Sequence, residues 1–454
     1  MSKSTPSRYD FIAIGGGNTG LAASYRIAAA GRQVALVDRG PVGGLCGLAG
    51  CNPKKVLVRA TEVLDEVRHA GQHGIDAPVR GVDWGRVIAR KRTFTDPVPA
   101  DTEAGLAKAG VELIGGEARF VSPEKIAVDG REISAEGFVI GTGSKPRPLA
   151  FPGADLVAIT DDILNHPRPP ENLVILGAGV VAFEFGQVFA RLGSHVTFLM
   201  PSDRPLRGAD ETLVDALVAY SREALRIEFV AHARVRAVTA SQARFFVEVE
   251  IGATERVFEA DFVLNGAGRV ANLEALNLSA AGVAADKKGV VVDAYLRSPG
   301  NRRVFAGGDA HGRRQLSPVA SYEGRVVAKN FLEGDVQEVT YDAIPQAVYT
   351  VPPLAWVGKT EAEARQAGLK VKVNDFDMET WKIYAIAGEK PARIKLVMQE
   401  GSRRILGAHL YGAGAGELIN IFAMAIRFNL TAADLEKMVW AYPTFCSVLP
   451  AVLA

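Results

Sequence analysis

Several features are scarce in this chain, and each absence narrows its class. Three cysteines among 454 residues are too few for a disulfide-stabilised scaffold of this length. No uncharged apolar run of about 18 or more residues occurs, and Met1–Pro6 lacks the apolar core of a secretory signal. The formal net charge is only +1, which argues against binding to nucleic acid or to an anionic membrane. We therefore expect a soluble cytoplasmic protein of about three domains.

The N-terminal region combines a strand, a glycine-rich turn and a helix. Phe11–Ile14 predicts a strand that leads directly into Gly15-Gly16-Gly17-Asn18-Thr19-Gly20, and Leu21–Ala30 predicts a helix. A second strand, Val34–Val37, ends at Asp38. In such a βαβ unit the glycines let the backbone approach a pyrophosphate at the helix N-terminus, and the acid accepts a hydrogen bond from a ribose hydroxyl. The pattern predicts a dinucleotide site.

The same pattern recurs further along the chain. Strands at 173–176 and 195–199 flank the loop Gly177-Ala178-Gly179-Val180-Val181-Ala182 and a helix over 183–191. Where the first unit has an acid, this one has the neutral Met200, followed by Arg204 and Arg207. Guanidinium groups bind a 2′-phosphate, which an acid would repel, so the pattern favours NADPH over NADH. Alternatively these arginines are simply solvated, an interpretation that Asp203 favours.

The C-terminal third differs from both units. Prolines between residues 146 and 170 indicate a domain crossing, and a similar break lies at 334–345. Beyond it, residues 371–373 and 394–397 alternate as antiparallel strands do, while 417–428 and 432–439 have helical spacing. The expected fold class is therefore α/β, with two Rossmann-like nucleotide-binding domains and an α+β C-terminal domain.

Two of the cysteines, Cys46 and Cys51, lie in a glycine-rich segment that continues to Lys54. On one ideal helix, side chains at this spacing point about 140° apart, so a disulfide needs a distorted turn, which the glycines allow. A strained disulfide is easily reduced, and a thiolate near a helix N-terminus and Lys54 has a lowered pKa. The alternatives are two unrelated buried thiols or half of a metal site, although no nearby His completes a zinc site.

Together these motifs resemble the FAD-containing pyridine nucleotide-disulfide oxidoreductases, the family of glutathione reductase, dihydrolipoamide dehydrogenase and mercuric reductase. The resemblance spans essentially the whole chain and rests on GGxCxxxxCxPxK around the cysteines, GxGxxAxE ending at Glu184, Ile140–Ser144, Gly307–Asp309 followed by Leu316–Ala320, and landmarks at 349–352 and 407–410. It implies a homodimer that binds FAD and NADPH, with NADH as the alternative nucleotide.

The resemblance also implies domains and cofactor contacts. Residues 1–150 and 269–335 would form the FAD-binding domain, 151–268 the NAD(P)-binding domain and 336–454 the dimerisation domain. The residues implied to bind FAD are Gly15, Gly17, Asn18, Thr19, Gly20, Asp38, Gly44, Lys54, Ala118, Thr142, Gly143, Ser144, Asp309 and Ser317. Those implied to bind NADPH are Gly177, Gly179, Val181, Glu184, Arg204, Arg207 and Gly268.

Catalytic roles follow from the same resemblance. Lys54 and Glu184 would pair beside the flavin N5, on the face that receives hydride from NADPH. Cys51 would stack on the other face as the charge-transfer thiolate, and Cys46, the outer sulfur, would attack the substrate. For Glu184 the alternative is a surface helix residue in an i,i+4 contact.

The C-terminal segment departs from the family pattern. Most members carry His-Pro-Thr-x-Ser-Glu, which crosses to the partner subunit and supplies a Glu-oriented His as acid/base; this chain has Tyr442-Pro443-Thr444-Phe445-Cys446-Ser447. All seven histidines lie elsewhere. A phenol with a pKa of about 10 does not exchange protons at neutral pH as an imidazole does. We therefore expect impaired reduction of ordinary disulfides, with Tyr442 as the candidate catalytic residue at this place.

Three functions compete. The first is an NADPH-dependent disulfide reductase that uses Tyr442, water or a substrate with a good leaving thiol. The second is reduction of a soft metal ion, because mercuric reductases are similar in carrying Tyr near this place; Cys446 would then be a third ligand rather than a small buried side chain. Protection of a carbanion, as in ketopropyl-coenzyme M oxidoreductase/carboxylase, is a minor variant. The third is a non-catalytic redox sensor. His311 is either a displaced acid or a structural residue.

Overall fold

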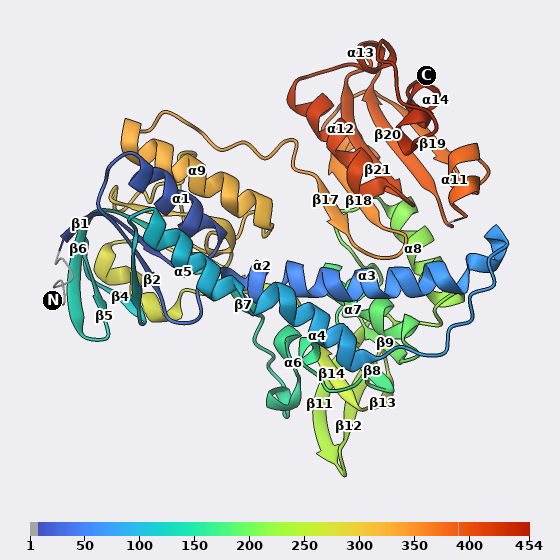
Figure 1. Cartoon of the computed structure of the whole chain (residues 1–454), viewed down its shortest axis with the longest axis horizontal. Helices are drawn as coiled ribbons and strands as arrows, with labels where there is room; N and C mark the ends of the chain where they lie inside the picture. The colour runs from blue at the N-terminus through green and yellow to red at the C-terminus, as the bar shows by residue number, and fades with distance from the viewer. Residues whose placement is uncertain (1–7, 389) are drawn as a thin grey trace. The chain divides into compact units, whose positions relative to one another are not determined.

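The computed structural model describes residues 8–388 and 390–454 (Figure 1), so that Met1–Pro6, where the sequence predicts no secretory signal, lies outside them. The chain forms two compact units. Unit 1 comprises the residues up to Pro53, Ile88–Pro148 and Gly268–Val339, and unit 2 comprises Lys54–Val87, Leu149–Ala267 and Thr340–Ala454. The four domain boundaries expected from the sequence stay a prediction.

Unit 1 is built on a seven-stranded sheet in the order β3-β2-β1-β6-β5-β4, with β16 paired to β6. Its strands are β1 (Arg8–Ile14), β2 (Val34–Asp38), β3 (Glu112–Gly115), β4 (Ala118–Ser122), β5 (Lys125–Val128), β6 (Arg131–Ile140) and β16 (Val304–Ala306). Strands β3, β2, β1, β6 and β16 pair in parallel, whereas β4 and β5 are antiparallel. Both faces of the parallel part are covered, so Phe11, Ile12 and Ala13 of β1 are fully buried.

Helices α1 (Asn18–Ala29) and α9 (Ser317–Glu333) lie side by side in unit 1 (Figure 1). Helix α1 follows β1 and precedes β2, as the sequence predicts. The Thr19 hydroxyl donates to the Ala320 carbonyl at 3.1 Å, and a Cβ on Gly324 would come within 2.5 Å of the Thr19 carbonyl oxygen. The N-termini of two helices that are distant in sequence are therefore held together. Unit 1 also contains α2 (Gly44–Leu48), α5 (Val98–Lys108), β7 (Ser144–Pro146), β15 (Arg269–Ala271), η3 (Glu274–Leu276), η4 (Leu278–Ala281) and η5 (Gly308–Ala310).

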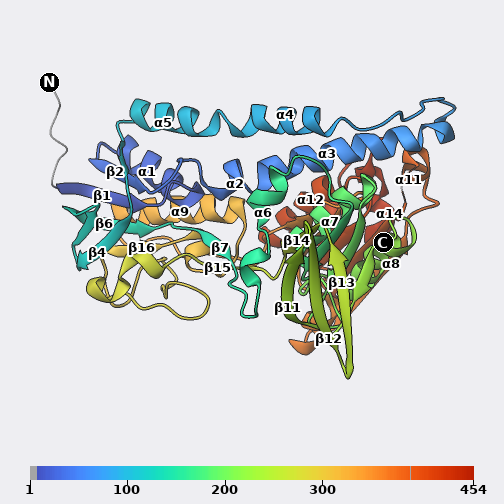
Figure 2. The same ribbon diagram turned by 90° about the horizontal axis from the view of Figure 1, so that it is seen from below.

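Unit 2 contains the second predicted βαβ arrangement. Its parallel sheet has the order β10-β9-β8-β14, from β8 (Asn172–Leu176), β9 (His195–Leu199), β10 (Glu228–Val230) and β14 (Phe262–Asn265). Helix α7 (Val180–Arg191) connects β8 to β9, and α8 (Glu211–Glu223) follows β9. Figure 2 also shows the antiparallel strands β11 (Ala233–Ser241), β12 (Arg244–Ile251) and β13 (Thr254–Ala260), which the sequence analysis did not predict.

The C-terminal part of unit 2 is an antiparallel sheet in the order β17-β18-β21-β20-β19, with α12 (Ala415–Arg427) packed against β18 and β21. The strands are β17 (Gln346–Val348), β18 (Leu354–Gly358), β19 (Val371–Asp377), β20 (Arg393–Gln399) and β21 (Ile405–Tyr411). The predicted strands lie within β19 and β20, which are neighbours. The helix predicted over 432–439 is shorter, because α13 (Ala432–Glu436) ends before Val439, whose exposed side chain has no core to pack against.

The other helices are α3 (Cys51–Arg68), η1 (Ala70–His73), α4 (Trp84–Thr95), η2 (Ala154–Leu156), α6 (Thr160–Leu164), α10 (Glu361–Gln366), α11 (Lys382–Ala387), η6 (Phe445–Val448) and α14 (Leu449–Leu453). Among residues 8–388 and 390–454, no helix has both the length and the apolar character that crossing a membrane requires. A cytoplasmic location remains a prediction from the sequence.

Candidate active site

The first glycine loop borders a pocket of about 90 Å³ in unit 1. Four residues implied to bind FAD line it: Gly15, Asp38, Ala118 and Thr142. Gly15 has a φ of +109°, and a Cβ there would lie 2.4 Å from the Gly141 carbonyl oxygen, so the position requires glycine. The pocket thus gathers residues from four separate segments at the carboxyl ends of β1 and β2, where α/β sheets bind ligands.

Two features make this pocket suitable for a dinucleotide. The Thr142 hydroxyl is buried and has no hydrogen-bond partner among residues 8–388 and 390–454, which costs free energy unless a ligand supplies one. The Asp38 carboxylate accepts from Gly16 N at 2.6 Å and from Gly40 N at 2.9 Å, so its position at the pocket wall is fixed by the backbone. Gly17 precedes the first residue of α1, whose N–H groups and dipole favour a phosphate.

Further residues implied to bind FAD are joined by direct contacts. A Cβ on Gly44 would lie 2.6 Å from the Gly17 Cα, so the segment that carries the cysteines lies directly against the glycine loop. The Asn18 amide donates to the Ser317 carbonyl at 3.2 Å. Gly20 also requires glycine, because a Cβ there would lie 2.0 Å from the Gly15 carbonyl oxygen.

Ser144 and Asp309 form a second group of predicted contacts. The Ser144 hydroxyl donates to Asp309 at 2.6 Å and accepts from Arg269 Nε at 2.8 Å. Burial raises the pKa of the Asp309 carboxyl above its ordinary value, and the Ser144 hydrogen bond opposes this shift. Gly143, with a φ of +67°, forms the turn that precedes this serine.

The cysteine pair spans a helix break. Cys46 lies within α2, whereas Cys51 is the first residue of α3. Gly50 lies between them, and a Cβ there would come within 2.8 Å of the Leu45 carbonyl oxygen. The distorted turn expected from the sequence is therefore an interruption between two helices. Cys46 is half-buried and Cys51 is exposed.

The two cysteine sulfurs have different surroundings. The pKa of the Cys46 thiol is raised, first by its hydrogen bond with Cys51 and second by burial. Cys51 Sγ also lies 3.3 Å from the Ser317 hydroxyl, at the N-terminus of α9. Two helix N-termini therefore meet at the Cys51 sulfur, where they stabilise negative charge. The raised pKa favours a protonated Cys46, and the helix N-termini favour negative charge at Cys51.

Lys54 and Glu184 form an ion pair within unit 2. Lys54 lies on the first turn of α3, and Glu184 lies on α7 with a side chain only 2% exposed. The Glu184 Oε1 accepts from the Tyr349 backbone N–H at 2.8 Å. Glu184 is thus a buried, paired residue and not the surface helix residue that the sequence left as an alternative. Tyr349 belongs to the 349–352 landmark, but the contact of its backbone N–H with Glu184 cannot be read from residue types.

The second glycine loop has the same local geometry as the first. Gly177 has a φ of +110°, and a Cβ there would lie 2.4 Å from the Gly266 carbonyl oxygen. Gly179 is exposed at the start of α7, and Val181 is half-buried on its first turn. This open helix N-terminus is suited to a phosphate.

The structure brings the predicted arginines near this loop. The Leu206 N–H donates to the Ala178 carbonyl at 3.1 Å, which fixes the segment from Arg204 to Arg207 beside the glycines. Both arginines are exposed, and Arg204 pairs with Glu211 at 3.2 Å. Gly268, by contrast, belongs to unit 1, where its carbonyl accepts from the Arg147 N–H.

The C-terminal segment Tyr442–Ser447 contains no histidine. Tyr442 is 70% exposed, and Cys446 is half-buried against the core of the C-terminal sheet, which favours its interpretation as a small packing residue. His311, in unit 1, is buried and lies with Nε2 2.9 Å from Glu323, whose other oxygen accepts from Gly308 N. This geometry favours the structural interpretation of His311.

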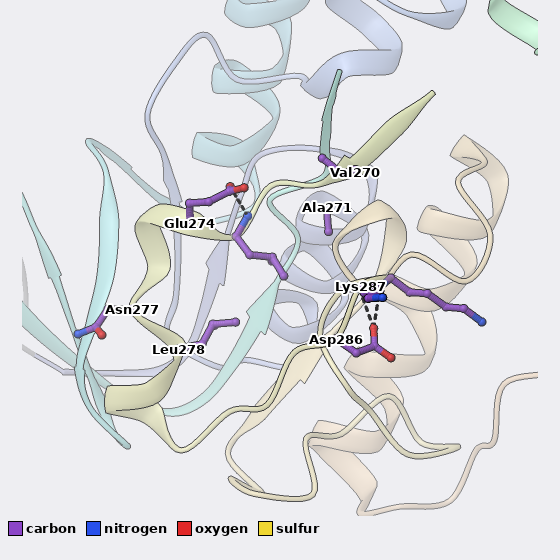
Figure 3. A pocket seen from close by; sticks show the side chains of 10 residues that line it. Val270, Ala271, Glu274, Asn277, Leu278, Asp286 and Lys287 are labelled. Carbon is purple, nitrogen blue, oxygen red and sulfur yellow. Dashed lines mark hydrogen bonds between the residues drawn. The ribbon is translucent and has the colours of Figure 1, made fainter. Parts of the chain in front are cut away.

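A larger pocket of about 340 Å³ lies on another side of η3 (Figure 3). The two acidic side chains that line this pocket are bonded to other residues of the chain. Glu274 accepts from the Leu273 N–H and pairs with Lys145, while Asp286 accepts from the N–H groups of Lys288 and Gly289. None of the predicted site residues lines it.

Comparison with known proteins identifies the class. Residues 9–324 match the family model of the pyridine nucleotide-disulphide oxidoreductases, and residues 344–451 match the dimerisation domain of the same family. The chain belongs to this family. It is therefore a FAD-dependent oxidoreductase that uses NAD(P)H, with a mixed α/β fold and a C-terminal dimerisation domain, which implies a homodimer. These findings confirm the fold, the family and the cofactors expected from the sequence.

Among relatives, the chain is 32% identical to a mercuric reductase of Bacillus cereus, over 97% of this chain and 70% of that protein. It is 32% identical to a dihydrolipoyl dehydrogenase of Bacillus subtilis strain 168 and 30% identical to a glutathione reductase of Burkholderia cepacia, with 96% of each chain covered in both cases. The structure is similar to the HOCl-induced flavoprotein disulfide reductase RclA of Escherichia coli, with a TM-score of 0.87, 25% identity and coverage of 98% and 99% of the two chains. A Cu(II) complex of RclA matches equally well, with a TM-score of 0.87.

Proposed function

We propose that this protein is an NADPH-dependent disulfide reductase that works through the Cys46–Cys51 pair. The observation that carries the proposal is the position of Cys51 at the first residue of α3, with its sulfur 3.3 Å from the Ser317 hydroxyl at the first residue of α9, because helix N-termini stabilise a thiolate. Unrelated buried thiols would not be hydrogen-bonded to one another, and Cys51 is exposed. FAD, when bound, supplies the ring system that relays two electrons between the nicotinamide and the thiols.

Residues of this chain supply a positive charge for the flavin and stabilise the thiolate of the cysteine pair. Lys54 contributes a positive charge that Glu184 and the Tyr349 N–H hold in place. Ser317 and the N-terminus of α3 stabilise the Cys51 thiolate. Cys46 passes its proton to the Cys51 thiolate through their hydrogen bond and attacks the substrate disulfide, which forms a mixed disulfide and releases one thiolate. Cys51 then gives this proton to the released thiolate and attacks Cys46, which closes the Cys46–Cys51 disulfide and releases the second thiolate.

The substrate we propose is a small-molecule disulfide whose leaving thiol has a low pKa. The reason is Tyr442, which replaces the family's histidine and supplies no proton readily at neutral pH. A substrate that needs little protonation of its leaving thiolate avoids this deficit.

Reduction of a soft metal ion is the second candidate. It is supported by the same Tyr442 and by two comparisons: relatives named mercuric reductase, and the Cu(II) complex of the structurally similar RclA. Thiolates are the ligands that soft cations prefer. Cys446, partly buried against its own core, supports a third ligand less well.

The two candidates are separated by the acceptor that reoxidises the NADPH-reduced enzyme. The reduced protein is mixed anaerobically with glutathione disulfide, lipoamide, an aromatic disulfide with a low leaving-group pKa, Hg²⁺ or Cu²⁺, and the flavin absorbance is followed. Fastest turnover with the aromatic disulfide supports our proposal. Turnover with a metal ion and none of the disulfides supports the second candidate.

A further inference from the structure

Helix α7 carries a stripe of three buried polar side chains in addition to its apolar surface. Glu184, Gln187 and Arg191 are each 2% exposed and recur at i, i+3 and i+7, which places them along one face of the helix. Burial of such groups costs free energy unless each is hydrogen-bonded, and a buried ion pair seldom stabilises a protein more than well-packed apolar residues would. Packing alone therefore does not explain why these three polar side chains are buried.

Arg191 joins four separate elements. Its Nε donates to Asp65 on α3 at 3.2 Å, and its Nη1 donates to Gln187 on the same helix at 3.0 Å. Its Nη2 donates to the Tyr220 hydroxyl on α8 at 3.1 Å and to the Val351 carbonyl at 2.5 Å. The planar guanidinium is suited to this because it presents five donors in a fixed geometry.

Gln187 extends the same contacts. Its Oε1 accepts from the Val351 N–H at 3.1 Å, and its Nε2 donates to Ser221 on α8 at 3.0 Å. Glu184 accepts from the Tyr349 N–H two residues earlier. The stripe thus binds the backbone of residues 349–351 at three groups: the N–H of Tyr349, and the N–H and carbonyl of Val351.

The stripe also holds α3 at two points. Glu184 pairs with Lys54 on the first turn of α3, and Arg191 pairs with Asp65 three turns further along the same helix. Both groups that orient the Glu184 carboxylate, the Lys54 ammonium and the Tyr349 N–H, therefore belong to segments that Arg191 and Gln187 fix against α7.

We propose that Arg191 and Gln187 are positioning residues that set the geometry of the Lys54–Glu184 pair. The inference rests on the proposed function, in which Glu184 holds the Lys54 charge that serves the transfer of electrons from NADPH to the flavin. Arg191 acts from a distance, by holding α3 and residues 349–351, and it does not contact the reacting atoms. Loss of either residue leaves the Glu184 carboxylate with less firmly placed partners, and a misplacement of about 1 Å costs up to about 100-fold in rate.

The test measures flavin reduction by NADPH in the anaerobic holoenzyme by stopped flow, with the limiting rate separated from the NADPH dissociation constant. We expect Arg191→Met and Gln187→Met to lower the limiting rate by about 10-fold or more with little change in NADPH affinity. Arg191→Lys keeps the positive charge but loses the planar guanidinium, so its limiting rate should lie between those of the wild type and Arg191→Met. A second readout is amide hydrogen exchange at Tyr349 and Val351, which should speed up in the same variants. Asp65→Asn tests the same link from the less buried side, should Arg191→Met fail to fold.

Arg68→Met is the matched control. Arg68 Nη1 donates to the Arg191 backbone carbonyl at 2.8 Å, so it also joins α3 to α7, through a backbone group and not through the Arg191 guanidinium. Variants of the stripe that reduce flavin at the wild-type rate overturn the proposal, and so does an equal loss in Arg68→Met, which would show a general need for helix attachment. A wild-type flavin that NADPH does not reduce contradicts the proposed function instead.

Discussion

Lys54 and Glu184 form an ion pair that joins the first turn of α3 to α7, and Glu184 is almost completely buried in it. The Lys54 side chain is 13% exposed, so water does little to screen the pair. The pair fixes a positive charge on the first turn of α3, a charge that the family resemblance predicts to lie beside the flavin N5. Loss of either charge leaves the other buried and uncompensated.

Glu184→Gln should both destabilise the protein and slow flavin reduction. Removing one partner of a buried pair leaves the Lys54 ammonium uncompensated, which costs about 3 kcal/mol or more. Denaturant unfolding measures the free energy, and stopped flow measures the reduction rate. Glu211→Gln is the control, because Glu211 is 70% exposed in its pair with Arg204 and its loss should cost less than about 1 kcal/mol. Equal losses in the two variants would contradict the importance of the buried pair.

The raised pKa of Cys46 should depend on Cys51. The hydrogen bond with Cys51 is the main cause of the shift, so in Cys51→Ser the Cys46 thiol should lose its proton at a lower pH than in the wild type. The measurement is the alkylation rate of Cys46 in the reduced protein as a function of pH, read by peptide mass. Cys446→Ser should leave the profile unchanged. An unaltered Cys46 profile in Cys51→Ser would show that burial alone raises this pKa.

Ser317 should stabilise the Cys51 thiolate. Because its hydroxyl lies 3.3 Å from the sulfur, Ser317→Ala should raise the pH midpoint at which the reduced enzyme forms its thiolate–flavin charge-transfer absorbance, by roughly one unit. Ser317→Thr keeps a hydroxyl and should restore the wild-type midpoint. A midpoint that is the same in all three proteins would show that the Ser317 hydroxyl does not stabilise the Cys51 thiolate.

Arg204 and Arg207 should select NADPH. The double variant Arg204→Gln/Arg207→Gln should lower kcat/KM for NADPH by about 10-fold, with little change for NADH, because only NADPH carries the 2′-phosphate. Arg236→Gln is a suitable control, since that exposed arginine pairs with Glu250 on the neighbouring strand. A wild-type preference for NADH would establish the arginines as solvated surface residues.

The parts of the fold that depend on local backbone chemistry were predictable. Gly15 and Gly177 both adopt positive φ beside a carbonyl of a distant turn, and their spacing from the preceding strand is visible in the sequence. The glycines around Cys46 and Cys51 indicated that a distorted turn was possible there, and the structure has a helix break at this place. The pairing of Lys54 with Glu184 came from the family resemblance, because nothing in periodicity connects residues so far apart.

Other features depend on tertiary placement. Arg191 and Gln187 bind the backbone of Val351, which lies more than 150 residues away in the sequence. Such a contact cannot be predicted from residue types, because every residue type has the same backbone carbonyl. Cys51 meets Ser317 only because α1 holds the start of α9. The strands β11–β13 were missed although Val247 and Val249 alternate with acidic residues, a pattern typical of a half-buried strand.

Anaerobic titration of the FAD-loaded enzyme with NADPH tests the central claim most directly. The account predicts a long-wavelength charge-transfer band after uptake of two electrons, from the Cys51 thiolate against oxidised flavin, and loss of that band in Cys51→Ser. A wild-type enzyme whose flavin is bleached by NADPH without any such band would contradict a redox-active Cys46–Cys51 pair.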